Sequence, residues 1–227
     1  MTIDRENEAH ASELRESTAA KLSSQKEEHY TYADYCAWDD GKRWELIEGV
    51  AYAMSAPLRV HQDISREMLL QFGNFLLGKP CKVYAAPFDV RLNADAADDT
   101  VVQPDLLVVC DRSKLDDKGC KGAPDLVVEI LSPSTAGYDR IVKFLQYLKA
   151  GVKEYWMVYP EEKNVQVCVW KDGQYFMMAY AETDTIPVSV LPGLEIRLPD
   201  VFAEVLAPVE GAVSADEAGA TISSSGS

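Results

Sequence analysis

The sequence predicts a mixed α/β (α+β) fold, in which a central sheet has one helix before its middle strands and one after them. Three segments support this prediction. Apolar residues recur at helical spacing in residues 60–77, residues 123–131 form a nearly continuous apolar run, and residues 137–150 return to helical spacing. Because strand-like segments flank the second helix, we expect helices to cover a mixed sheet.

The first half of the chain is expected to hold two helices and a hairpin. The elements are a helix at 31–38, a hairpin at 43–54, the helix at 60–77, and strands at 82–86 and 88–92. Thr31 is a good N-cap for the first helix, and Glu48-Gly49 suits the hairpin turn. The sequence Gly78-Lys79-Pro80 ends the long helix.

The second half is expected to alternate strands with one helix. The elements are strands at 101–110 and 123–131, the helix at 137–150, and strands at 154–158, 165–170 and 175–180. Ser134 or Thr135 can cap this helix, and Gly151 suits its C-terminal end. Its buried stripe is predicted to be Ile141, Phe144, Leu145 and Leu148. A homodimer is also expected, with the exposed strand edge near residues 165–180 as one contact.

The folded domain is expected to span residues 29–209. A polar, mobile arm at 1–28 precedes it, and a disordered tail of small polar residues follows at 210–227. No run approaches the roughly 18 to 20 apolar residues that cross a bilayer. Because the N-terminus also lacks the apolar core of a secretory signal, we expect a cytoplasmic protein that does not enter the membrane.

Charge and cysteine content exclude several classes of protein. The net charge of −15 argues against a protein that coats nucleic acid without specificity. The five cysteines include no C-x-x-C pair, and their number is odd. Free thiols are therefore expected, rather than a disulfide framework or a zinc site.

Two acids interrupt apolar strands and are the first candidates for chemistry. Asp105 lies in QPDLLVV and Glu129 in PDLVVEILSPST, each flanked by valine, leucine or isoleucine. A buried carboxylate is unfavourable unless it is paired or binds a metal. Asp125 and Glu129 lie about 13 Å apart along one strand, too far to share an ion. If their strands are neighbours, Asp105 and Glu129 face each other at about 5 Å, which makes them the better pair.

Such a pair suits Mg²⁺. Two close carboxylates repel each other, and a cation between them removes that repulsion. Mg²⁺ uses one or two carboxylates, keeps several waters, and leaves positions for phosphate oxygens. It would polarise a phosphoryl group and acidify a bound water.

Several motifs together resemble the Uma-type restriction endonuclease family of the PD-(D/E)XK nuclease superfamily. They are WELIEG (44–49), APLRVHQ (56–62), QPDLLVV (103–109), PDLVVEILSPST (124–135), DRIVKFLQYLKAGVKEYWMV (139–158) and YP (159–160). The resemblance implies a restriction-endonuclease-like mixed central sheet flanked by helices. It also implies a metal-dependent endodeoxyribonuclease, a hydrolase that cleaves DNA phosphodiester bonds with Mg²⁺, or Mn²⁺ as its substitute.

The resemblance also implies the site residues. Asp105, Glu129 and Glu45 would be catalytic carboxylates and metal ligands. The superfamily lysine two residues after the glutamate is replaced by Leu131, and the resemblance moves it to Lys143 on the next helix. A further departure is Tyr159-Pro160, where the family usually has Asp-Pro.

Accessory residues complete the predicted mechanism. Lys143 would orient the attacking water or stabilise charge on the phosphate. Gln103, His61 and Tyr147 are possible accessory residues, with Tyr147 expected on the helix face of Lys143, opposite the apolar stripe.

Simpler roles remain open for each residue. The Glu129 carboxylate could be hydrogen-bonded by backbone groups or paired with an arginine, and Asp105 could mark a strand irregularity after Pro104. Glu45 could pair with Arg43 or Lys42, and Lys143 could pair with Asp139. His61 and Gln103 could have structural roles only.

Two other functions also remain open. One is a catalytically weak nuclease-fold module for nucleic-acid or protein interaction, which would turn Lys143 to solvent. The other is a hydrolase of small phosphates, which would need a closed pocket.

Overall fold

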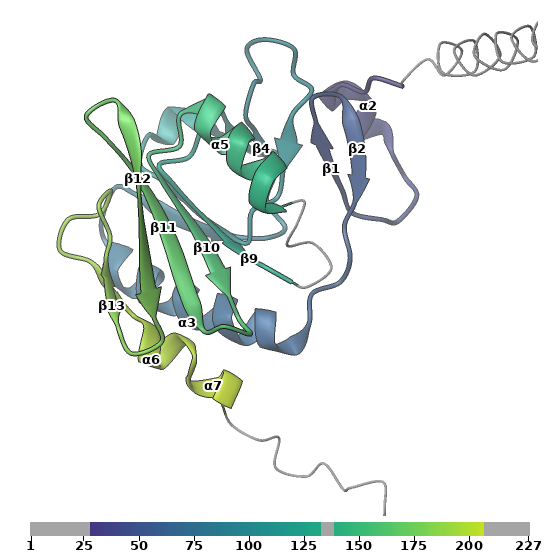
Figure 1. The fold of residues 1–227 in the computed structure, drawn as a ribbon. Helices are drawn as coiled ribbons and strands as arrows, with labels where there is room; N and C mark the ends of the chain where they lie inside the picture. The colour runs from purple at the N-terminus through teal and green to yellow at the C-terminus, as the bar shows by residue number, and fades with distance from the viewer. Residues whose placement is uncertain (1–27, 133–138, 207–227) are drawn as a thin grey trace, which may run out of the picture.

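A mixed six-stranded sheet forms the centre of the protein (Figure 1). The structure is a computed structural model that describes residues 28–132 and 139–206. Within these residues the central sheet has the order β12-β11-β10-β9-β6-β3. Its strands are Gln174–Ala181, Asn164–Lys171, Glu154–Tyr159, Leu126–Ile130, Leu106–Val109 and Lys82–Ala85 in that order. Only β9 and β10 run parallel among these neighbours, so the sheet is mixed as predicted.

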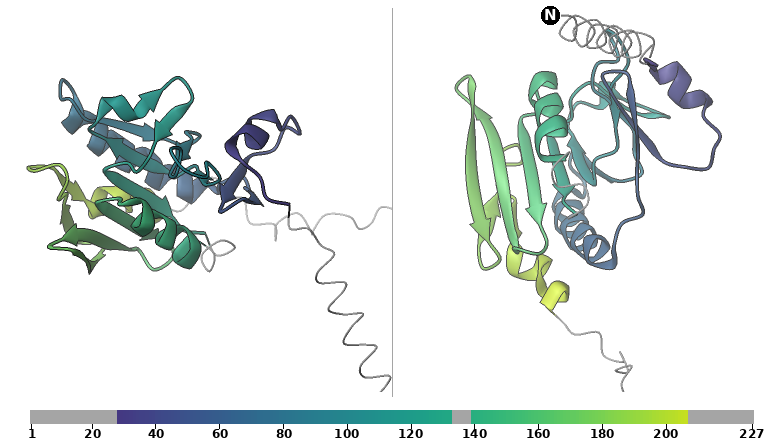
Figure 2. Two further views of the ribbon diagram at one scale, coloured as in Figure 1. Left: turned by 90° about the horizontal axis from the view of Figure 1, so that it is seen from above. Right: turned by 45° about the vertical axis from the view of Figure 1, so that its right-hand side comes forward.

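Two helices cover opposite faces of the central sheet, as Figures 1 and 2 show. Helix α3 (Arg59–Leu76) packs on one face and α5 (Phe144–Ala150) on the other. Side chains of β9 alternate between these faces: Val128 belongs to the core under α3, and Val127 to the core under α5. Because helices cover both faces of the sheet, the sequence of β9 is almost continuously apolar. Glu129 lies on the same face as Val127, which is the face that α5 covers.

A second sheet stands beside the central one, with the order β2-β1-β5-β4-β8-β7. Its strands are Val50–Ala53, Trp44–Ile47, Val101–Val102, Val90–Arg91, Gly119–Lys121 and Leu115–Asp116. The single strand predicted at 101–110 is therefore wrong, because β5 and β6 belong to different sheets. Pro104 explains the break, since proline donates no hydrogen bond and restricts the residue before it.

Most other predicted elements are confirmed. Helix α2 (Tyr32–Ala37) begins after Thr31, whose side chain and Asp34 form a capping box. The β1–β2 hairpin turns at Glu48-Gly49, as predicted, and Asp172-Gly173 form the turn between β11 and β12. Short elements were not predicted: the 3-10 helix η1 (Arg112–Lys114), strands β7, β8, β13 (Thr185–Pro187) and β14 (Glu195–Arg197), and helices α6 (Leu198–Val201) and α7 (Ala203–Leu206).

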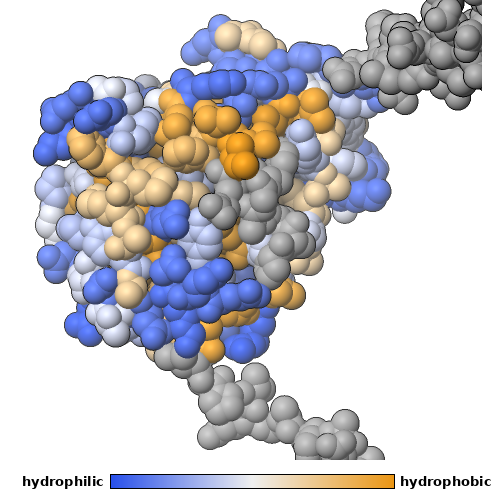
Figure 3. All heavy atoms as spheres, viewed as in Figure 1, coloured by the Kyte–Doolittle hydropathy of each residue, from blue (hydrophilic) through white to orange (hydrophobic). Residues whose placement is uncertain are grey.

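The helix after β9 buries a different face from the predicted one. It starts as a π-helical segment, η2 (Asp139–Lys143), and continues as α5. Ile141 is 64% exposed and Leu145 47%, whereas Lys143 is 3% and Tyr147 0% exposed. Figure 3 shows apolar residues at the surface where α5 lies. The predicted stripe is wrong for Ile141 and Leu145, because the helix turns Lys143 and Tyr147 toward the buried carboxylate of Glu129. Phe144 is partly buried and packs against the core, as predicted.

The expectation of free thiols is wrong for two of the five cysteines. Cys81 and Cys110 form a disulfide. Cys81 precedes β3 and Cys110 follows β6, and the pairing of Lys82 with Val109 places the two cysteines opposite each other. The three other cysteines, Cys36, Cys120 and Cys168, are free. The two cysteines are 29 positions apart in the sequence, and the strand register brings them together.

Other predictions stay untested. Apart from Glu28, the predicted arm lies outside the described residues, as do Ser134, Thr135 and the tail. Strand β12 is an edge of the central sheet and exposes Phe176, Met177 and Met178, but a homodimer through it stays a prediction. In the described part of the chain, no helix is both long and apolar enough to span a membrane.

Candidate active site

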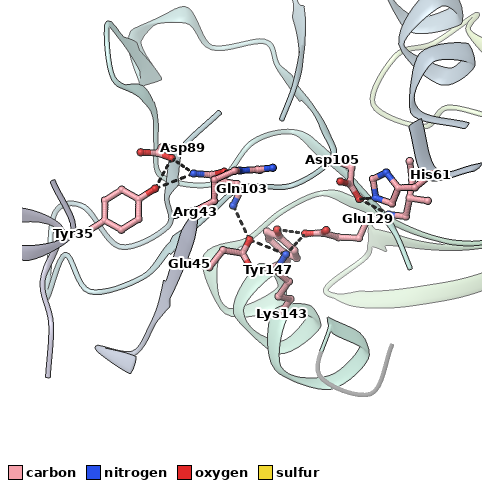
Figure 4. A network of polar contacts seen from close by, with 11 residues as sticks. Tyr35, Arg43, Glu45, His61, Asp89, Gln103, Asp105, Glu129, Lys143 and Tyr147 are labelled. Atoms are coloured by element: carbon pink, nitrogen blue, oxygen red, sulfur yellow. Dashed lines mark hydrogen bonds and ion pairs between the residues drawn. The ribbon is translucent and has the colours of Figure 1, made fainter. Parts of the chain in front are cut away.

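Glu129 lies at the centre of a buried polar cluster under α5 (Figure 4). Its Oε1 accepts hydrogen bonds from Lys143 Nζ at 3.1 Å and from the Tyr147 hydroxyl at 2.6 Å. The three residues are 4%, 3% and 0% exposed, respectively. Burial and the nearby carboxylates of Glu129 and Glu45 raise the pKa of Tyr147 well above its ordinary value. Tyr147 therefore stays a neutral hydrogen-bond donor.

Lys143 joins Glu129 to a carboxylate from the other sheet. Its Nζ lies 2.8 Å from Oε1 of Glu45, which is 4% exposed on β1. The same oxygen accepts the backbone N–H of Gln103 at 2.8 Å. Glu45 thus contacts Lys143 and Gln103, not Arg43 or Lys42 as one simpler interpretation held. Buried charges need such partners, and one ammonium here serves two carboxylates.

Asp105 reaches the same region from the start of β6. Because Leu106 pairs with Val128, the next position in the register sets Asp105 opposite Glu129, as the sequence suggested. Asp105 Oδ2 accepts the backbone N–H of Ile130 at 2.7 Å and lies 3.1 Å from Nε2 of His61.

His61 comes from the first turn of α3, and its Nδ1 is buried without a hydrogen-bond partner in the described residues. Asp125 has a structural role: it accepts the backbone N–H of Cys110 and pairs with Lys153 near the start of β9.

Gln103 connects the cluster to a second network. Its Nε2 donates to the Tyr35 hydroxyl and to Asp89 Oδ1, both at 2.9 Å. Burial raises the pKa of Asp89, although the Tyr35 and Gln103 hydrogen bonds oppose this, and burial also raises the pKa of Tyr35. Because Nε2 is committed to these acceptors, Oε1 faces the Arg43 guanidinium, which donates Nε–H at 3.0 Å and Nη2–H at 2.7 Å.

Arg43 was not among the predicted site residues, and the sequence carried no motif for it. Its guanidinium is held by the neutral amide oxygen of Gln103. In the described residues it makes no ion pair with a carboxylate. By contrast, the Lys143 ammonium and the His61 imidazole each contact a carboxylate. The charge of Arg43 is therefore not neutralised by direct pairing.

One cavity of about 650 Å³ brings these groups together. Its wall includes all four predicted catalytic residues, two predicted accessory residues and the unpredicted arginine: Glu45, Asp105, Glu129, Lys143, Gln103, His61 and Arg43. Tyr147 lies behind Glu129 and supports it from α5. Residues far apart in the chain thus converge on one hollow.

The donor set suits a hard divalent cation. Asp105 and Glu129 present carboxylate oxygens from opposite positions on adjacent strands. Mg²⁺ needs only one or two carboxylates, with water filling its other positions. Among the described residues no three acids, histidines or cysteines lie close enough to form a ligand group. A pair of carboxylates is therefore the donor set to consider, and Asp105 and Glu129 are the pair that could hold a cation.

Comparisons with known proteins agree with this fold. The family described as "Uma2: Putative restriction endonuclease" matches residues 31–200. An uncharacterized protein of Synechocystis sp. is 28% identical over 175 residues, which cover 74% of this chain and 89% of that protein. The crystal structure of "a putative nuclease belonging to DUF820" from Anabaena variabilis aligns with a TM-score of 0.64 and 21% identity, covering 78% of this chain and 99% of that one.

The Lys143→Met variant tests the buried cluster. Without the ammonium, Glu45 and Glu129 would be buried close together with no cation, so we expect a loss of about 3–5 kcal/mol in the free energy of unfolding at pH 7. Urea denaturation measures this loss. The control is Lys149→Met on the same helix: Lys149 is 63% exposed in its pair with Glu48, and about 0–1 kcal/mol is expected. Equal stability of the two variants would contradict the bridging role.

Proposed function

The chain belongs to the Uma2 family, as its motifs predicted, and from this membership we propose a metal-dependent endonuclease that hydrolyses DNA phosphodiester bonds. One observation carries the proposal. Glu45, Asp105, Glu129 and Lys143, which come from four separate elements or loops, line one cavity. Carboxylates beside a fixed ammonium are the groups that phosphodiester hydrolysis needs.

Asp105 and Glu129 are the residues that would hold Mg²⁺, with Mn²⁺ as a substitute. A bound ion supplies Lewis-acid polarisation of the phosphoryl group and a more acidic water. The protein contributes the alignment of its ligands. The His61 imidazole and the Ile130 N–H fix Asp105, and Tyr147 fixes Glu129 through a neutral hydroxyl.

Lys143 supplies the fixed positive charge. It is held by Glu45 and Glu129 and lies in the cavity wall, where its ammonium can stabilise negative charge that grows on the phosphate. Leu131, at the usual superfamily lysine position, also lines the cavity but has no charge to offer. We propose that Lys143, from η2, takes the role of that strand lysine.

Arg43 is proposed to bind a phosphate of the substrate. Its guanidinium lines the cavity and is anchored by Gln103 without an ion pair in the described residues. Arginine binds phosphate oxygens through two parallel N–H groups, and a guanidinium that makes no direct ion pair can still attract an anion. The positive charge of Arg43 lies in the wall of the cavity, although the net charge of the chain is −15.

The alternative is a catalytically weak interaction module, which predicted a solvent-facing Lys143. Lys143 is 3% exposed and contacts two site carboxylates. This burial favours the enzyme over the interaction module.

Plasmid cleavage tests the enzyme. We expect metal-dependent nicking of supercoiled DNA, and Asp105→Asn should slow it by about 100-fold or more. The matched control is Asp125→Asn, in the other Pro-Asp pair, which should keep cleavage because Asp125 lies outside the cavity. If folded wild-type protein nicks DNA with neither Mg²⁺ nor Mn²⁺, the endonuclease proposal fails and the interaction module remains. Equal rates for Asp105→Asn and wild type would remove Asp105 from the mechanism.

Salt-dependent DNA binding tests Arg43. With Ca²⁺ in place of Mg²⁺, Arg43→Gln should weaken binding and reduce the slope of log affinity against log salt by about 0.7–0.9, the loss of one phosphate contact. Lys42→Gln, at the exposed neighbouring residue, should change the slope less. Fluorescence anisotropy with a labelled duplex measures both. An unchanged slope and affinity in Arg43→Gln would contradict the phosphate contact.

A further inference from the structure

A second pocket lies on the other side of β1 from the candidate active site. Glu45 and its cross-strand partner Tyr52 line the active-site cavity, whereas Trp44 and Ala51 line this second pocket. Successive side chains of a strand point to opposite faces, so the neighbours Trp44 and Glu45 of β1 line different hollows. The pocket lies between α2, the loop after it and the β1–β2 hairpin, which Figure 2 shows at the side of the molecule. Its volume is about 440 Å³.

Three aromatic rings form its walls. The Tyr30 and Trp38 rings have centroids 5.2 Å apart and an interplanar angle of 83°. The Trp38 and Trp44 rings are 5.7 Å apart at 63°. The Trp38 ring thus meets the rings of Tyr30 and Trp44 at steep angles, so the three rings do not form a single stack. Ring faces carry partial negative charge, and groups of aromatic rings that line a pocket bind alkylated ammonium groups.

The charged groups around the pocket favour the same ligand. Asp39 and Asp40 also line it. The backbone N–H of Lys42 and the Trp44 indole N–H donate to Asp40, and the hydrogen bond from Lys42 is the main reason that the pKa of Asp40 is lowered. Asp40 is therefore ionised at neutral pH. The carboxylate of Asp39 makes no ion pair within the part of the chain that is described.

A cation of the chain already lies near one wall. The ammonium of Lys42 is 5.7 Å from the centroid of the Trp44 ring, within the range of a cation–π contact. The carboxylates of Asp39 and Asp40 repel phosphate, so this pocket does not belong to the proposed DNA path. None of the proposed catalytic residues lines it.

We propose that this pocket binds an alkylated ammonium group. The rings supply cation–π contacts and apolar surface for the alkyl groups, and Asp39 and Asp40 supply the opposite charge. The group has two sources with the same chemistry: a small quaternary ammonium compound, or a methylated lysine side chain of a peptide. A neutral molecule of the same shape gains only the apolar part of this attraction.

The test compares choline with its neutral isostere 3,3-dimethyl-1-butanol at constant ionic strength. Tryptophan fluorescence and calorimetry on the full chain follow binding. We expect saturable choline binding that is about tenfold or more tighter than that of the alcohol. Trp38→Ala and Asp39→Asn should both weaken it, whereas Trp170→Phe, at an exposed tryptophan outside the pocket, should not. Because Asp39 is exposed, Asp39→Asn remains informative if Trp38→Ala unfolds.

Peptides identify the source of the ligand. A trimethyl-lysine peptide that binds more tightly than choline, and more tightly than its unmethylated form, assigns the pocket to a protein partner. Choline binding without peptide binding assigns it to a small compound. Equal affinity for choline and the alcohol, or no saturable binding of any cation by folded wild-type protein, would overturn the proposal. Neither result depends on DNA cleavage.

Discussion

The ammonium of Lys143 is the contact on which the arrangement of the site depends. It lies between Glu45 of the second sheet and Glu129 of the central sheet, while Lys143 itself ends η2. Two buried carboxylates without a cation would repel each other and resist burial. The lysine therefore holds two sheets and a helix in one relative position. It also explains why this helix buries Lys143 and Tyr147 and exposes Ile141 and Leu145.

The second constraint is the passage of the chain from one sheet to the other at residues 103–105. Pro104 ends β5, and the chain continues as β6 in the central sheet. The residues on either side of the proline then have separate tasks. Gln103 holds Glu45 through its backbone and Arg43 through its side chain, and Asp105 turns toward His61 and β9. The candidate site thus lies where the two sheets meet, and a single strand across 101–110 could not have supplied both contacts.

The part of the site that the sequence predicted rests on local patterns. Two acids in apolar strands are visible in any single sequence, and antiparallel pairing of their strands then sets Asp105 opposite Glu129. The likeness of the motifs to a known family added Glu45 and Lys143.

Arg43 was not predicted because its place in the site depends on a long-range hydrogen bond to Gln103, sixty positions away. The Cys81–Cys110 bond was not predicted for the same reason, since register rather than spacing joins the two residues. The buried face of this helix was predicted incorrectly because the prediction counted only hydrophobic positions. Such a count takes no account of a buried carboxylate that the polar side chains of the helix contact.

The most direct measurement of the central claim is anomalous X-ray diffraction from crystals soaked in Mn²⁺. The account predicts an anomalous peak in the active-site cavity, coordinated by carboxylate oxygens of both Asp105 and Glu129 and by water, with the Lys143 ammonium beside it. A cavity without a peak, with Lys143 still between Glu45 and Glu129 at saturating Mn²⁺, would contradict it. In that case the buried lysine would be a structural cation, and the carboxylates would have no metal to hold.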